Sequence, residues 1–184
     1  MKRWRIGVAL AVGLATFLVG WSGARASAPG PGYLNVREFE VVAQNGQTAK
    51  LFAFTDADIP IRADAFIKSH LVVGIAWADV DTGKAFVATI HPLIGRDSKQ
   101  NPDGWHAHSV TVSGGATPPN DFCLVSVDST PTAGIQIHGN TMNVNVRLAD
   151  LPEAPGAFNA GAGFTLGKDA ACVSGIAVLL VKDA

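Results

Sequence analysis

Short runs of alternating apolar and polar residues, separated by turn residues, recur along most of the chain. Successive side chains of a β-strand point to opposite faces of the sheet, so this alternation is typical of strands with one buried face. Three short turns between such runs indicate hairpins: Asn-Gly at 45–46, Asp-Thr-Gly at 81–83 and Gly-Asn at 139–140. The pattern therefore favours an antiparallel, all-β fold.

We expect eight to ten strands, the last of them over 172–181, arranged as a single-domain, Greek-key-like β-sandwich, with a barrel as the related architecture. One segment departs from the strand pattern. Over 58–69, Asp58 suits a helix cap, Pro60 suits a first turn, and Phe66 and Ile67 fall at helical spacing. We predict a short helix there, and an irregular loop with one helical turn is the alternative.

Residues 1–28 have the composition of an export signal. A basic start is followed by an uncharged, mostly apolar run over 6–21 and by small residues with two A-x-A sites over 22–28. The alternative is an uncleaved membrane anchor, but the apolar run is short for a span and contains three glycines. We predict a signal peptide over 1–28 and a β-sandwich domain over 29–184 that works in the periplasm or outside the cell.

Loss of the signal segment would leave the protein acidic. The segment holds four of the 14 Lys and Arg residues and none of the 15 Asp and Glu residues, so ten basic and 15 acidic side chains remain. Nucleic acids and anionic membrane surfaces require clustered Lys and Arg. The formal charge of −5 therefore argues against both as partners.

The chain has two cysteines, Cys123 and Cys172. In an exported protein an even pair is most simply a disulfide. It would close a loop of roughly 50 residues and contribute on the order of 4 kcal/mol in the chain-entropy model. The alternative is that one cysteine serves as a metal ligand or a reactive thiol.

The segment 101–112, NPDGWHAHSVTV, carries the feature that points most directly to a function. Turn formers are followed by a strand-like run that contains His106 and His108. Two histidines at positions i and i+2 of a strand project from the same face. His91 ends the preceding strand-like run, and a strand, a loop and a return strand would bring it next to this pair.

Three imidazoles that converge from adjacent strands can bind copper or zinc and leave one coordination position open. We therefore predict a metal site formed by His91, His106 and His108. Carboxylates can add an oxygen ligand or orient an imidazole from outside the ligand shell. The candidates for that supporting role are Asp97, Asp103 and Asp121.

A structural explanation of the histidine pair stays open. The face that His106 and His108 share continues with Val110 and Val112. The two histidines could thus be partly buried near a sheet end, with their ring nitrogens satisfied by backbone carbonyls and Asp side chains.

The sequence Gly-Trp-His-Ala-His at 104–108 resembles the Gly-Phe-His-x-His copper strand of the copper–zinc superoxide dismutases, which are Greek-key sandwiches. The resemblance covers five residues. That family has further metal histidines downstream, whereas only His138 follows here, at a different distance. The resemblance implies that this spacing on a strand can hold copper, and it does not extend to the activity.

Three functions are compatible with these patterns. The first is an exported β-sandwich that binds copper or zinc through the histidines without catalysing a reaction. The second is a module that binds a protein or a glycan through the long loop 92–104, with structural histidines. The third is a metal-dependent enzyme. The sequence contains neither a G-x-S-x-G nucleophile motif nor a glycine-rich nucleotide-binding motif.

Overall fold

The computed structural model describes residues 31–62, 72–91 and 104–181. Ten strands and three short 3-10 helices make up the described part, and every strand pairing is antiparallel, so the prediction of an antiparallel all-β fold is confirmed. The strands are β1 Val36–Gln44, β2 Thr48–Thr55, β3 Val73–Asp79, β4 Lys84–Ile90, β5 His106–Ser113, β6 Phe122–Ser129, β7 Gly134–His138, β8 Thr141–Arg147, β9 Ala160–Lys168 and β10 Ile176–Leu180. The 3-10 helices are η1 Gly32–Leu34, η3 Leu148–Asp150 and η4 Pro155–Ala157.

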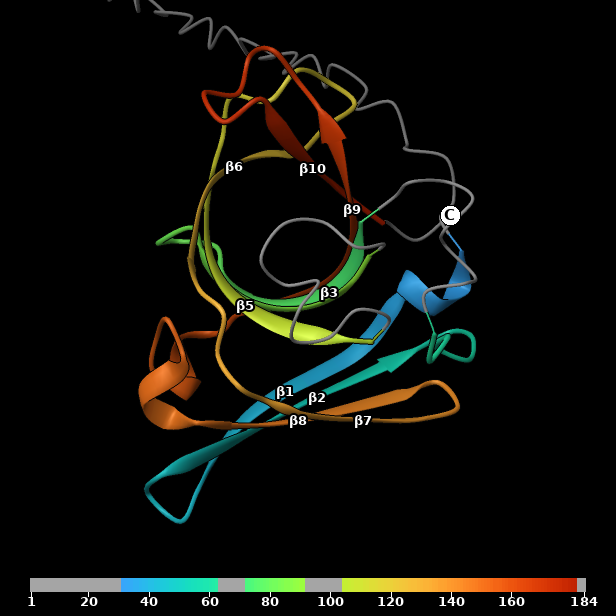
Figure 1. Ribbon diagram of the computed structural model, residues 1–184, viewed down its shortest axis with the longest axis vertical. Helices are drawn as coiled ribbons and strands as arrows, with labels where there is room; N and C mark the ends of the chain where they lie inside the picture. The colour runs from blue at the N-terminus through green and yellow to red at the C-terminus, as the bar shows by residue number, and fades with distance from the viewer. Residues whose placement is uncertain (1–30, 63–71, 92–103, 182–184) are drawn as a thin grey trace, which may run out of the picture.

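The strands form two layers of different shape. One layer is an open sheet with the order β1-β2-β8-β7, and the other is a closed barrel with the order β10-β6-β5-β4-β3-β9. Figure 1 looks down the barrel, and the open sheet lies below it. The predicted packing of antiparallel layers is therefore present, and closure of one layer into a barrel is its main elaboration. Closure leaves the barrel layer without unpaired strand edges.

The main apolar core lies between the open sheet and the outside of the barrel. Leu51 of β2 and Val144 of β8 pack in one cluster with Trp77 of β3 and Phe86 of β4, and all four are completely buried. Burial of one such side chain stabilises the fold by roughly 1.5–3 kcal/mol. The indole N–H of Trp77 donates to the carbonyl oxygen of Phe52 at 2.8 Å, so the large ring is buried without an unsatisfied donor.

The three hairpin turns predicted from the sequence are all present. β1 pairs with β2, β3 with β4, and β7 with β8, each through the expected turn. Asn45 and Gly46 have φ angles of 52° and 66° and are the central residues of a turn in which the Gln47 N–H donates to the Gln44 carbonyl oxygen. Gly83 and Gly139 also have positive φ angles, of 71° and 59°. Residues of these types therefore set the strand register locally.

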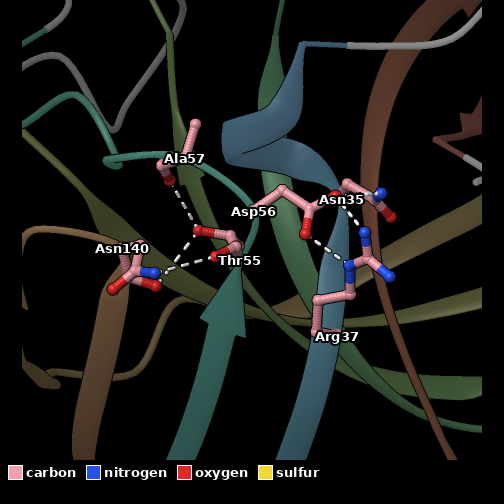
Figure 2. A network of polar contacts seen from close by, with 6 residues as sticks. All are labelled: Asn35, Arg37, Thr55, Asp56, Ala57 and Asn140. Atoms are coloured by element: carbon pink, nitrogen blue, oxygen red, sulfur yellow. Dashed lines mark hydrogen bonds and ion pairs between the residues drawn. The ribbon is translucent and has the colours of Figure 1, made fainter.

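A polar network fastens one end of the open sheet (Figure 2). Arg37 and Asn35 both donate to the carboxylate of Asp56, and the pairing with Arg37 lowers the pKa of Asp56 from its ordinary value. The Thr55 hydroxyl lies 2.9 Å from the carbonyl oxygen of Ala57. The side-chain amide of Asn140 donates to the carbonyl oxygen of Thr55 at 3.1 Å. The network joins the start of β1, the end of β2 and the turn before β8.

Cys123 and Cys172 form a disulfide, with their Cα atoms 5.2 Å apart, as predicted. Cys123 lies in β6, but the expected strand over 172–181 is shorter than predicted and starts at Ile176. The reason is a turn at 169–175, in which Gly175 adopts a φ of 72° and its N–H donates to the Cys172 carbonyl oxygen. The disulfide therefore ties β6 to the turn that precedes β10.

Two predicted segments lie largely or wholly outside the residues that the structure describes. The helix expected over 58–69 lies mostly outside the described residues, and its described part, 58–62, is irregular or bent. The signal peptide expected over 1–28 lies entirely outside them. Among the described residues, none of the helices has the length and apolar character needed to cross a membrane.

Candidate metal centre

The pairing of β4 with β5 places all three predicted ligands at one end of the barrel. In this ladder Thr89 lies opposite His106, and Val87 lies opposite His108. His91 comes two residues after Thr89, immediately beyond the end of β4. Strand periodicity directs residues 87, 89 and 91 to the same face as their partners on β5. The antiparallel register therefore converts a separation of 15 residues in the chain into spatial proximity.

The imidazole rings of His91, His106 and His108 are close enough to share one ion. The Nε2 atoms of His91 and His106 are 2.9 Å apart. The ring centroid of His106 lies 4.6 Å from that of His91 and 4.9 Å from that of His108. One ring nitrogen from each residue belongs to a set of donor atoms that all lie within 4.8 Å of one another. We call these three residues the histidine cluster.

Hydrogen bonds to neighbouring groups orient two of the rings. Nδ1 of His106 lies 3.0 Å from the carbonyl oxygen of Gly104, which can only accept a hydrogen bond. In the neutral ring the proton is then on Nδ1, and the lone pair of Nε2 points toward His91. Nδ1 of His108 lies 3.1 Å from the hydroxyl oxygen of Thr130. Partners of this kind commonly hold a ligating histidine in place.

The histidine cluster is shielded from solvent. His106 is 5% exposed and His108 is 6% exposed, whereas His91 is partly exposed. Nε2 of His106 also lies 3.3 Å from the hydroxyl of Thr89, which is buried as well. Burial strengthens the interaction between an ion and its ligands because less water screens it.

The observed distances suit a small transition-metal ion. Metal–nitrogen bonds of about 2.0–2.1 Å place two tetrahedral ligand atoms about 3.3 Å apart. The His91–His106 pair at 2.9 Å is close to that spacing, and the ligand atoms of all three histidines lie within 4.8 Å of one another. The described part of the chain contributes no carboxylate to the cluster, so the donor set is three imidazole nitrogens.

Of the three predicted supporting carboxylates, only Asp121 lies among the described residues. Asp97 and Asp103 lie outside the described residues. Asp121 accepts a hydrogen bond from the backbone N–H of Leu180 at 2.8 Å, next to the seam between β6 and β10. It is not among the potential ligands grouped with the histidines. Its described contact thus stabilises the closure of the barrel.

Two threonines near the cluster were not anticipated from the sequence, whereas a backbone carbonyl partner, here that of Gly104, was part of the structural explanation of the histidine pair. Thr89 could have been found, because it precedes His91 by two residues in an alternating strand. Thr130 lies 22 residues from its partner His108, and no local pattern connects them. Of the other histidines, His138 is exposed on β7 and His70 lies outside the described residues.

Comparisons of the chain with protein-family models, with curated proteins and with solved structures found no match.

Proposed function

We propose that this chain is an exported protein that binds one transition-metal ion, copper or zinc, through His91, His106 and His108. The observation that carries the proposal is the grouping of one nitrogen from each histidine within 4.8 Å. The His106 hydrogen bond to Gly104 supports it, because with the proton on Nδ1 the lone pair of Nε2 points into the cluster, as a metal ligand requires. The predicted absence of catalysis stays a prediction.

The donor set favours some metals over others. Imidazole nitrogen binds zinc, copper, nickel and iron, whereas magnesium and calcium prefer oxygen ligands. Three neutral imidazoles do not compensate the two positive charges of a divalent ion in a buried site. A fourth, anionic ligand from solution would reduce that cost, and three protein ligands leave a position for it.

Export is supported by two independent features. The disulfide between Cys123 and Cys172 is of a kind that persists in oxidising compartments and is rare in the cytosol. Residues 1–28 have the composition of a signal peptide. Together they favour the periplasm or the extracellular space.

Calorimetric titration of the metal-free chain 29–184 with Zn²⁺ and with Cu²⁺ tests the proposal. We expect one ion per chain. Replacement of a ligand, as in His91→Gln or His108→Gln, should weaken binding by about 100-fold or more, since even outer-shell partners are worth about 10–100-fold. His138→Gln on the open sheet is the matched control and should bind like the wild type.

Glutamine is chosen because it retains polarity and much of the volume at a buried position. Thermal unfolding of each metal-free variant shows whether it folds. The proposal is wrong if folded His91→Gln and His108→Gln proteins both bind Zn²⁺ and Cu²⁺ as tightly as the wild type, or if the wild type binds neither ion.

A further inference from the structure

The inside of the barrel is a cavity rather than a filled core. Its volume is about 710 Å³, within the range of about 300–1,000 Å³ that is typical of small-molecule pockets. The space exists because several interior side chains are small. Five alanines line the interior on three neighbouring strands, β9, β3 and β4: Ala76, Ala78, Ala85, Ala160 and Ala162.

The wall of the cavity is overwhelmingly apolar. The other contributors are mainly larger aliphatic and aromatic side chains, such as Val87, Val110, Phe122, Phe164 and Val178. Burial of alkyl groups against such a wall is favourable by about 25 cal/mol per Å² of apolar surface removed from water. The chemistry of the wall therefore selects a hydrocarbon group.

Among the described lining residues, polar groups lie at the two ends of the cavity. The lining reaches from the β3–β4 turn, where Asp79 and Asp81 lie, to the histidine cluster, where Thr89, His91 and His108 line it. The ends are separated by the length of β4, seven residues or about 20 Å. The exposed Lys168 also lines the cavity, at the end of β9 remote from Ala160, the partner of Ala78; it therefore lies toward the histidine end, where its charge also favours an anion.

We propose that the barrel binds an amphiphilic small molecule, with an alkyl chain in the cavity and a carboxylate at the histidine cluster. An anionic head group is disfavoured near Asp79 and Asp81. At the opposite end the carboxylate supplies an anionic oxygen ligand, which an ion bound by three neutral imidazoles lacks. The placement of the carboxylate rests on the metal site proposed above, whereas the occupation of the cavity by the alkyl chain does not.

Calorimetry with two probes, dodecanoic acid and dodecan-1-ol, separates these two parts. Each is titrated into the metal-free and the zinc-loaded chain 29–184, below the concentration at which the probe aggregates. We expect both probes to bind the metal-free protein at one molecule per chain. Zinc should tighten binding of the acid by roughly tenfold, since only the carboxylate is an anionic ligand. Binding of the alcohol should stay within about twofold.

Space-filling variants test the location of the alkyl chain. Ala78→Phe and Ala162→Phe each place a ring inside the cavity, and both should weaken binding of the two probes by about tenfold or more without loss of zinc affinity. Ala43→Phe adds the same ring at an exposed position of β1 and is the control. A series from octanoic to dodecanoic acid tests the wild type itself, with an expected gain of about three- to fourfold per methylene.

The outcomes are distinct. If neither probe binds with or without zinc, or if the folded Phe variants bind like the wild type, the cavity is not the binding site. If affinity does not increase along the acid series, the proposal fails even when the Phe variants do not fold. If the alcohol binds but zinc does not bind or does not tighten the acid, the carboxylate placement is wrong. The same conclusion follows if Lys168→Gln, rather than His108→Gln, abolishes the effect of zinc on the acid.

Discussion

The Nε2 atoms of His91 and His106 lie 2.9 Å apart, although 15 positions separate the two residues in the chain. The contact depends on the antiparallel ladder between β4 and β5, which sets Thr89 opposite His106. Both strands belong to the closed barrel, so neither can shift its register without disturbing its other neighbour. The histidine cluster is thus placed by a part of the fold that resists local rearrangement.

Thr130 should influence the metal affinity without being a ligand. Its hydroxyl lies 3.1 Å from Nδ1 of His108, so Thr130→Val removes the group that orients this ring. We expect zinc affinity to decrease by about tenfold. Thr130→Ser keeps the hydroxyl and should restore most of the affinity in a calorimetric titration.

The control for this change is Thr111→Val on β5. The Thr111 hydroxyl donates to Asp128 at 2.8 Å, and strand alternation places Thr111 on the face of β5 opposite to that of His106 and His108. The Thr111→Val variant should bind zinc like the wild type. Equal zinc affinity of Thr130→Val and Thr111→Val would exclude the positioning role of Thr130.

Gly163 of β9 should not tolerate even a methyl group. A Cβ atom at this position would lie 1.9 Å from the carbonyl oxygen of Leu34, which is completely buried. The backbone must therefore shift, and we expect Gly163→Ala to lower the free energy of unfolding by about 1–3 kcal/mol or more. Gly167→Ala on the same strand meets nothing within 4 Å, and its unfolding midpoint in urea should change little.

Reduction of the disulfide should destabilise the protein strongly. Cys123 and Cys172 are separated by 49 residues, so the cross-link restricts a long loop of the unfolded chain. The chain-entropy model gives a loss of about 4 kcal/mol on reduction, measured by urea unfolding with and without a reductant. The double variant Cys123→Ala/Cys172→Ala should show the same loss and no response to the reductant. An unchanged midpoint on reduction would contradict this account.

Protonation of Asp169 should make the protein less stable in acid. Its carboxylate accepts hydrogen bonds from the backbone N–H groups of Ala171 and Thr117 and from the side chains of Thr117 and Asn120. These bonds, led by the one from Ala171, lower the pKa of Asp169 from 3.8 to about 2. Between these pH values the unfolded chain binds more protons than the folded protein. The stabilisation is therefore complete above about pH 4 and is lost as the pH falls through about 2.

Asp169→Asn tests this assignment through urea unfolding between pH 2 and pH 6. The variant should be less stable than the wild type at pH 6 and should lose less stability on acidification. Glu38→Gln, an exposed change on β1, is the control and should follow the wild-type curve. If the wild type and Asp169→Asn have parallel curves, the network does not depend on ionised Asp169.

Local patterns were enough to predict several elements. The Asn45-Gly46 turn and the alternation on its two sides are local properties, and they place β1 against β2 without knowledge of the rest of the chain. The same is true of His106 and His108, whose shared face follows from strand periodicity. By contrast, the expected strand over 172–181 starts only at Ile176, because a turn supported by distant contacts of Asp169 precedes it.

The sequence by itself determined the antiparallel β character, the hairpin turns, the cysteine pair and the three histidines that lie together. These properties follow from side-chain period, turn chemistry and residue count, each of which acts over a few residues. Only the tertiary structure decided that β10 closes the barrel between β6 and β9, that alanines leave a cavity inside it, and that Thr130 meets His108. Those features depend on how strands distant in the chain pair around a closed ring, and alternation alone does not encode which strands become neighbours.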